Sequence, residues 1–328
     1  MRTFIADSQS YPIRGIFRIS RGEKTEARVV EVSISEDGVV GHGECVPYAR
    51  YGETVKSVLG QLAHVKTAVE QGLSRADLQD LLRPGAARNA IDCAMWDLEA
   101  RTSGIPVAKI AEVGEELQAV NTAFTLSLDS PEAMARAASA NAHLPLLKLK
   151  LGGLGDLERV RAVRAAAPSI RLIADANESW STTNLQEYLP TMHELGVELI
   201  EQPLPAGDDD FLETFDSPVP LAADESCRDL QSLRGLAGKY SIANIKLDKT
   251  GGLTEAIQLQ KLAHSLGFRT MIGCMVATSL SMAPGLVVAQ HADVVHLDGP
   301  MLLQRDRNPS LKYSGGLVHP SDGGVWAK

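Results

Sequence analysis

The segment Leu147-Lys148-Leu149-Lys150-Leu151 begins a series of polar residues at nearly constant spacing, and the fold can be predicted from this series. Each later member follows a short apolar run, 22 to 26 residues after the one before: Asp175, Glu201, Asp224 and Lys246. One strand, one helix and two loops have about this length. A (β/α)₈ barrel carries its chemistry at the C-terminal ends of its strands, so the series predicts a single active site.

From about residue 120 onward, apolar strand-like runs alternate with helical patterns such as Thr254 to Leu266. Candidate strands end near Leu126, Lys150, Asp175, Glu201, Ala223, Lys246, Gly273 and Asp298. This alternation predicts an α/β fold, with a (β/α)₈-type catalytic barrel over residues 116–304.

The first hundred residues have a different pattern. Alternating apolar and polar residues on both sides of Asp37-Gly38 predict a hairpin over 28–44, which should form an antiparallel meander with residues 2–7. Helical patterns follow at 53–72, 76–82 and 86–103. We therefore expect an α+β capping domain over residues 1–115, with the tail 305–328 folding back on it.

The composition is typical of a metabolic enzyme. With 328 residues, 44% hydrophobic and 22% charged, the chain exceeds a single barrel by about a third, which agrees with a second domain. The net charge of −9 argues against nucleic acid or an anionic membrane as a partner. No run approaches the roughly 20 apolar residues of a membrane span, and the first residues lack a signal-peptide core. We expect a cytoplasmic protein.

Three acids at the ends of consecutive strands predict a metal site. A lone acid after a strand is more often a helix N-cap, but Asp175, Glu201 and Asp224 would lie close together. Such carboxylates raise one another's pKa unless a cation neutralises them. An all-oxygen set favours Mg²⁺ or Mn²⁺ over zinc, so we expect one such ion per subunit.

The lysines point to proton transfer. Strand alternation places both Lys148 and Lys150 on the inner face of a barrel, and it places Lys246 inward with Asn244. We expect Lys249 to lie in the following loop, as a solvated residue. A lysine beside another lysine and a divalent cation should have a lowered pKa and can then act as a base.

This ordered set of residues resembles the enolase superfamily, in particular its muconate lactonizing enzyme subgroup. The segments Asp175-Ala-Asn-Glu-Ser-Trp180, Asn244-Ile-Lys-Leu-Asp-Lys-Thr-Gly-Gly252 and Leu297-Asp-Gly-Pro300 are similar to those of bacterial L-Ala-D/L-Glu epimerases. The resemblance covers nearly the whole chain. It implies a Mg²⁺-dependent isomerase that epimerises dipeptides, most simply L-Ala-D-Glu and L-Ala-L-Glu.

The resemblance also implies roles for individual residues. Lys150 and Lys246 would serve opposite faces of the substrate, one removing the α-proton to give an enediolate and the other reprotonating it. Lys148 would tune Lys150 and contact the substrate carboxylate. Asn177 and Glu225 would contact and orient the metal ligands without binding the metal themselves.

Residues at the substrate end follow from the same resemblance. Asp298 would bind the dipeptide ammonium, often as part of Asp-x-Asp, but His296 occupies the first position here. His296 is either a tolerated residue that faces away from the substrate or a sign of altered ammonium binding. Arg21 resembles a lid arginine that pairs with the glutamate side-chain carboxylate, and Tyr48 to Glu53 would form a second lid segment.

Other functions remain open at this point. The same scaffold could host o-succinylbenzoate synthase, muconate cycloisomerase or a dipeptide epimerase of different side-chain specificity. A noncatalytic barrel is disfavoured by the intact Lys150 and Lys246. The expected partner is a small dipeptide, with a role in recycling cell-wall peptides; assembly into a homo-oligomer is compatible with the sequence.

Overall fold

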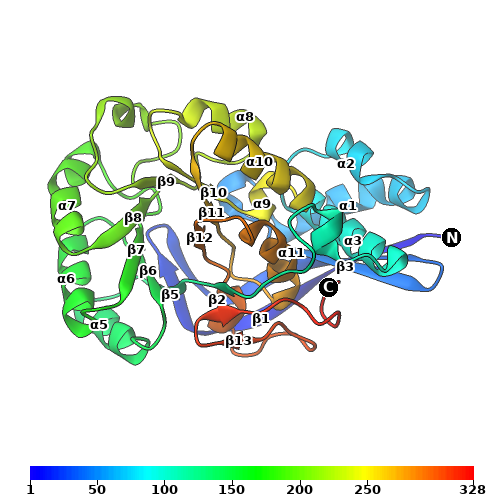
Figure 1. The fold of residues 1–328 in the computed structure, drawn as a ribbon, viewed down its shortest axis with the longest axis horizontal. Coiled ribbons are helices and arrows are strands. Elements are labelled where there is room, and N and C mark those ends of the chain that lie inside the picture. Colours follow the sequence, from blue (N-terminus) through cyan, green and yellow to red (C-terminus); the bar gives the residue numbers. More distant parts are fainter.

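The computed structural model describes residues 1–328 and contains an eight-stranded parallel sheet that curls into a barrel (Figure 1). Its strands follow one another in chain order: β5 (Phe124–Leu126), β6 (Leu146–Lys150), β7 (Arg171–Asp175), β8 (Val197–Glu201), β9 (Leu221–Ala223), β10 (Ile242–Ile245), β11 (Arg269–Ile272) and β12 (Val294–Val295). The predicted α/β fold and its eight strands are confirmed, although β12 ends three residues before Asp298.

The first and last strands meet. The Ala123 backbone N–H donates a 2.9 Å hydrogen bond to the Val295 carbonyl. One buried apolar side chain from each strand, or from the residue just before it, forms a separate cluster inside the barrel: Ala123, Leu146, Ile173, Leu199, Ala222, Ile242, Met271 and Val294. The barrel is therefore a packed core, and only its rim offers space for chemistry.

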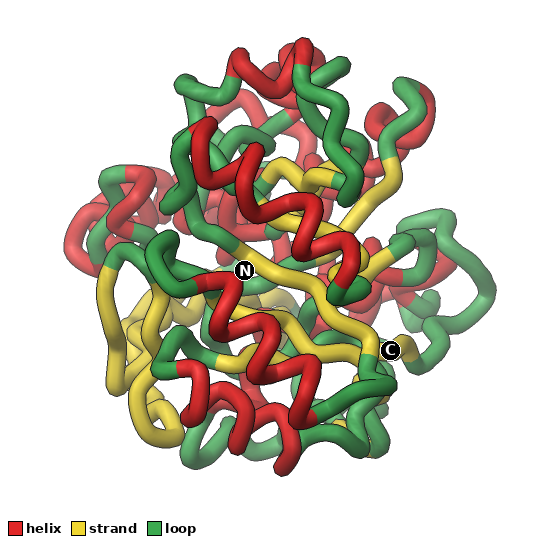
Figure 2. The backbone as a smooth tube through the Cα atoms, turned by 90° about the vertical axis from the view of Figure 1, so that its left-hand side faces the viewer, coloured by secondary structure: helices red, strands yellow, loops and turns green.

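Helices cover the outside of the strands (Figure 2). The longer ones are α5 (Pro131–Ala140), α6 (Asp156–Ala166), α7 (Thr182–Glu194), α10 (Leu253–Ser265) and α11 (Ser279–Ala289), with α8 (Leu230–Leu233) and α9 (Leu247–Thr250) each making one turn. The helix predicted over 254–266 is confirmed as α10. Between β8 and β9 the alternation is weaker, since only the 3₁₀ segment η2 (Asp210–Thr214) forms. Four prolines flank it and disfavour a longer helix: Pro203, Pro205, Pro218 and Pro220.

The N-terminal part contains a three-stranded antiparallel sheet and four helices. The strands are β1 (Thr3–Ile19), β2 (Gly22–Glu36) and β3 (Val39–Cys45), and the helices are α1 (Val55–Glu70), α2 (Arg75–Leu81), α3 (Ala86–Ser103) and α4 (Val107–Ile110). Asp37 and Gly38 both have positive φ, as the predicted two-residue hairpin turn requires. β1 is much longer than the predicted 2–7, and its far end reaches the barrel, where Arg18 N–H donates to Ser127 Oγ at 2.6 Å.

Helix α3 packs between this sheet and the barrel. Its backbone lies so close to β3 that a Cβ at Gly43 would come 2.0 Å from the Ala90 carbonyl oxygen. On its other side, Asp92 accepts hydrogen bonds from the N–H and the hydroxyl of Thr254 in α10. These contacts fix the N-terminal sheet against the barrel.

The C-terminal tail touches both parts. Strands β13 (Tyr313–Ser314) and β14 (Leu317–Val318) extend β4 (Val120–Asn121) into a small antiparallel sheet. The buried Trp326 indole N–H lies within hydrogen-bond distance of the His42 and Cys93 carbonyls of the N-terminal part. Among all helices of the chain, none has the length and apolar character needed to cross a membrane.

Candidate active site

Most of the site residues predicted from the sequence line one cavity of about 420 Å³ at the rim of the barrel, while Asp175, Glu201 and Glu225 are not part of its lining. Strand ends supply its floor, and the β1–β2 turn together with the segment after β3 supplies its roof. The lining includes Arg21, Lys24, Lys148, Lys150, Asn177, Asp224, Lys246, His296 and Asp298.

Three carboxylates form the centre of the floor. Asp175 ends β7, Glu201 ends β8 and Asp224 directly follows β9, so parallel pairing of adjacent strands brings them together. One oxygen from each lies within 4.8 Å of the others, and all three side chains are buried. Buried anions this close require neighbouring positive charge.

Lys148 and Lys150 both point into the barrel, as strand alternation predicts. Lys150 Nζ lies 2.6 Å from Asp175 Oδ2 and donates to Asn177 Oδ1 at 3.3 Å. Lys148 Nζ lies 3.1 Å from the same Asp175 oxygen and also pairs with Glu201. The two lysines thus approach the carboxylates from the β6 side.

Two further lysines approach from the β10 side, and one of them corrects a prediction. Lys246 Nζ donates to Asp224 Oδ2 at 2.6 Å. Lys249 was expected to be a solvated loop residue, but it is buried and donates to Asp224 Oδ1 at 2.6 Å and to the Asn244 carbonyl at 2.8 Å. The cause is α9, whose single turn returns Lys249 to the side of Lys246. Predicting a helical turn directly after Lys246 would have placed Lys249 beside the carboxylates.

The charges of this cluster shift one another's ionisation. Burial favours neutral Lys246, but its attraction to Asp224 and Glu201 outweighs burial and raises its pKa well above the usual range. Burial likewise opposes ionisation of Asp175, yet Lys150 and Lys148 outweigh it and lower its pKa. The sequence predicts a lowered pKa for a lysine beside a divalent cation, whereas the pKa of Lys246 is raised here. A divalent cation would offset the carboxylate charges that raise it.

The donor set fits a hard divalent cation. All three ligating groups are carboxylates, without the imidazole or thiolate ligands that zinc prefers. Burial and the charge of Asp175 raise the pKa of Glu201, although its Oε2 is paired with the Lys148 ammonium. A cation among these oxygens would stabilise the ionised form of Glu201.

His296 and Asp298, which follow β12, also line the cavity, and the His296 side chain faces inward. Its Nδ1 lies 3.4 Å from Lys148 Nζ, which can only donate, so Nδ1 is the acceptor and Nε2 carries the proton. Nε2 lies 2.9 Å from Asp298 Oδ1, while Asp298 Oδ2 accepts from the Thr125 N–H at 2.7 Å. Burial, opposed by Asp298 and aided by Lys148, lowers the pKa of His296 to about 4. This imidazole is neutral.

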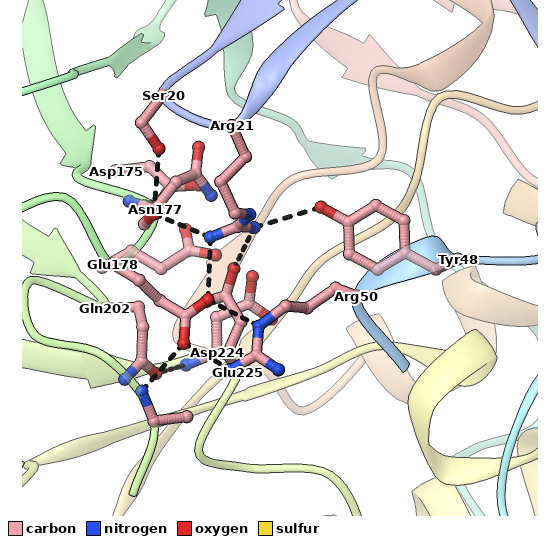
Figure 3. A network of polar contacts seen from close by, with 12 residues as sticks. Ser20, Arg21, Tyr48, Arg50, Asp175, Asn177, Glu178, Gln202, Asp224 and Glu225 are labelled. Atoms are coloured by element: carbon pink, nitrogen blue, oxygen red, sulfur yellow. Dashed lines mark hydrogen bonds and ion pairs between the residues drawn. The ribbon is translucent and has the colours of Figure 1, made fainter. Parts of the chain in front are cut away.

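Arg21 lies in the roof and is held by several acceptors (Figure 3). Its Nη1 donates to the Asn177 carbonyl at 2.7 Å and to Glu178 at 2.9 Å. Its Nη2 donates to Tyr48 Oη at 3.1 Å and to Glu225 at 2.5 Å. All four terminal N–H groups of the guanidinium therefore already have acceptors.

Lys24 was not singled out in the sequence, yet it lines the same cavity. Its ammonium lies 5.4 Å from the centre of the Tyr48 ring and makes no ion pair. Partial desolvation lowers its pKa, with no carboxylate acting in the opposite direction. Lys24 could not be predicted as a site residue, because the turn between β1 and β2 is too short to show a periodic pattern and a surface lysine there is ordinary.

Comparisons with known proteins agree with this geometry. Residues 1–111 match the mandelate racemase / muconate lactonizing enzyme N-terminal domain, and residues 132–325 match the enolase C-terminal domain-like family. The chain is 44% identical to the L-Ala-D/L-Glu epimerase of Escherichia coli, over 97% of this chain and all of that protein. It is 43% identical to an N-acetyl-D-glutamate racemase of Pseudoalteromonas, over 91% of this chain and 95% of that protein.

Solved structures of dipeptide epimerases and related proteins are also similar to this chain over nearly its full length. An enolase family member from Agrobacterium tumefaciens with homology to dipeptide epimerases, solved with sodium and L-Ala-L-Glu, has a TM-score of 0.98 and 48% identity over the full length of both chains. A dipeptide epimerase from Enterococcus faecalis, solved with Mg and L-Leu-L-Tyr, has a TM-score of 0.91 and 27% identity over 98% of both. The protein therefore belongs to the mandelate racemase and muconate lactonizing enzyme family of the enolase superfamily.

Proposed function

We propose that the protein is a Mg²⁺-dependent dipeptide epimerase whose preferred substrates are L-Ala-D-Glu and L-Ala-L-Glu. One observation carries this proposal: Lys150 and Lys246 approach the same carboxylate cluster from opposite sides. Lys150 ends β6 and Lys246 directly follows β10, and these strands lie four apart in a ring of eight and so face each other. An epimerase needs this arrangement, because the proton must leave one face of the α-carbon and return to the other.

In this mechanism the lysines share the proton transfers. Lys150 removes the α-proton of one epimer while the protonated Lys246 delivers a proton to the opposite face, and the roles reverse for the other epimer. Lys148 holds the substrate carboxylate and adds positive charge beside Lys150. Asn177 accepts a hydrogen bond from Lys150 and orients its ammonium.

Asp175, Glu201 and Asp224 would hold one Mg²⁺ per subunit, and Mn²⁺ would fit the same oxygen donors. When bound, the ion supplies positive charge that stabilises the negative charge developing on the substrate carboxylate. Glu225 follows Asp224 directly, and its contact with Arg21 connects the metal ligands to the roof.

The roof would recognise the glutamate side chain. Lys24 supports this role, since it is a cavity-lining cation without an ion pair. Arg21 adds positive charge at the same end, but its terminal N–H groups are already engaged. We therefore assign the direct contact with the distal carboxylate to Lys24, with Arg21 contributing through its charge.

His296 favours a second candidate, racemisation of an N-acylated glutamate. Asp298 would meet a substrate ammonium, but it already accepts hydrogen bonds and has no second carboxylate beside it. The neutral His296 can face an uncharged acyl amide without loss. The relative that is named N-acetyl-D-glutamate racemase supports the same substrate class.

Proton exchange in deuterated water would test both candidates. A library of dipeptides and N-acylated amino acids, followed by ¹H NMR at the α-position, should give fastest exchange for substrates with a free α-carboxylate and a distal carboxylate. No exchange with any Ala-Glu epimer would overturn the dipeptide assignment. Dehydration of a succinylbenzoate precursor, or muconate lactonisation, would instead support the lyase or cycloisomerase alternatives.

The chain divides into a capping unit and a catalytic barrel. We propose that residues 1–115, with the tail 305–328, form the capping unit, and that residues 116–304 form the catalytic barrel. Contacts of Trp326 with His42 and Cys93 support the attachment of the tail to the cap.

We also propose a cytoplasmic role in recycling cell-wall peptides. Measuring the Ala-Glu epimers in cells that lack the gene would test this role.

A further inference from the structure

Two segments of the roof are attached to a single loop of the barrel. The first lid segment, residues 19–24, is the turn between β1 and β2, and the second, residues 48–53, follows β3. Both reach the loop after β7, at Asn177 and Glu178, which lie two and three residues beyond Asp175 (Figure 3). The Asn177 carbonyl accepts hydrogen bonds from Ser20 Oγ at 2.9 Å and from Arg21 Nη1 at 2.7 Å.

Glu178 is the point at which both segments meet. Its Oε2 accepts from Arg21 Nη1 at 2.9 Å and from Arg50 Nε at 2.8 Å. Its Oε1 accepts from Arg50 Nη2 and from the Ala206 N–H, each at 2.8 Å. The Glu178 side chain is only 7% exposed, although Arg50 remains 37% exposed. One carboxylate thus binds a guanidinium from each lid segment.

The backbone at this loop supports a specific arrangement. Asn177 and Glu178 both have φ values in the left-handed region, 45° and 66°, which residues with side chains rarely adopt. The Asn177 N–H donates to Asp175 Oδ1, and the Glu178 N–H donates to the Gln202 carbonyl, each at 2.9 Å. The same turn therefore holds a metal-ligand candidate on one side and presents Glu178 to the lids on the other.

We infer that Glu178 is a positioning residue that latches both lid segments over the cavity through Arg21 and Arg50. The expected effect on KM rests on the proposed epimerase function, but the latch itself does not. Arg21 and Arg50 match in number the two carboxylates, Glu178 and Glu225, that they bind. Lys24 remains the cation of the first lid segment that is available to a ligand.

The latch predicts a distinct kinetic pattern. Glu178→Gln keeps an acceptor for Ala206 but removes the charge that holds two guanidiniums. The lysines and the metal ligands are not in contact with Glu178, so chemistry should change little once substrate is bound. We expect KM for L-Ala-L-Glu to rise at least tenfold while kcat changes less than threefold. A loss confined to kcat would contradict the latch.

Hydrogen exchange measured by mass spectrometry tests the latch without reference to activity. Peptides covering 19–24 and 48–53 should exchange at least tenfold faster in Glu178→Gln than in the unmodified protein, while peptides from the barrel strands stay unchanged. Unchanged exchange in both lid segments would overturn the inference. If exchange rises but the unmodified protein epimerises no dipeptide, the latch stands and the proposed function fails.

Two further variants complete the design. Arg50→Gln breaks the latch from its partly exposed side, so it tests the idea even if Glu178→Gln fails to fold, and it should accelerate exchange in the second lid segment. Glu198→Gln is the matched control, because it removes another two-pronged Arg–Glu pair, with Arg171, between β7 and β8. It should alter neither lid. Equal acceleration in Glu198→Gln would attribute the effect to general destabilisation and refute the latch.

Discussion

The floor and the roof of the cavity are held in place by different forces. The floor cluster is buried at the ends of adjacent parallel strands, where backbone pairing fixes Lys148, Lys150, Asp175 and Glu201, and the other members follow directly after β9 or β10. The roof consists of two surface segments held by ion pairs that remain partly exposed. Changes in the floor should therefore abolish the chemistry, whereas changes in the roof should alter affinity and selectivity by graded amounts.

Metal removal is the strongest test of the floor. A protein stripped with chelator should lose all epimerase activity, because the negative charge that develops on the substrate carboxylate would have no Lewis acid. Mg²⁺ or Mn²⁺ should restore it and raise Tm, since a bound cation relieves repulsion among Asp175, Glu201 and Asp224. Activity assays and thermal unfolding after verified stripping measure both effects. Full activity without metal would exclude the assignment.

Removing one lysine should be nearly as severe. Lys150→Ala and Lys246→Ala should each lower the epimerisation rate by about 10²- to 10⁴-fold, the usual contribution of a positioned acid or base. The remaining lysine should still exchange the α-proton of one epimer with solvent, and the two variants should prefer opposite epimers. ¹H NMR in deuterated water follows this exchange.

The exposed Lys261, which pairs with Glu112 on the surface, provides the control. Lys261→Ala should leave epimerisation unchanged. Normal epimerisation by Lys246→Ala would contradict the two-base mechanism.

The same contrast explains which parts of the site could be predicted from sequence. Strand alternation and a regular interval place the carboxylates, Lys148 and Lys150 on the rim, because a parallel barrel repeats one geometry around its axis. Lys249 was misplaced because a single helical turn interrupts that alternation. The pairing of Arg21 with Glu178 joins residues 157 positions apart, and no local pattern records such a contact.

The roof should determine selectivity for the distal carboxylate. Lys24→Met removes the proposed charge-assisted contact, worth about 1.5–3 kcal/mol, so kcat/KM for Ala-Glu should fall about 10- to 150-fold relative to Ala-Leu. Lys24→Arg should largely restore the ratio. Arg21→Met should instead lower kcat/KM for both dipeptides, because it loosens the lid. If only Arg21→Met changed the ratio, the roles of these two residues would be reversed.

The smallest expected effect concerns the amino end of the substrate, at the border between floor and roof. His296→Asp would place a second carboxylate beside Asp298, where the imidazole Nε2 now lies 2.9 Å from Asp298 Oδ1. A dipeptide ammonium would gain a partner, whereas an acyl amide would face two repelling anions. We expect the ratio of kcat/KM for L-Ala-L-Glu to that for N-acetyl-L-Glu to rise about tenfold, or about 1.4 kcal/mol.

The same variant should be less stable when no ligand is present, because two buried carboxylates would repel each other and the nearby Lys148 ammonium is already paired with Asp175 and Glu201. Its Tm should fall, and saturating dipeptide should recover more of that loss than saturating N-acetyl-L-Glu. His296→Gln is the matched control: it stays neutral and should leave the substrate ratio nearly unchanged. An unaltered ratio in His296→Asp would mean that this position does not face the amino end of the substrate, and the case for an N-acylated glutamate would then lose its structural basis.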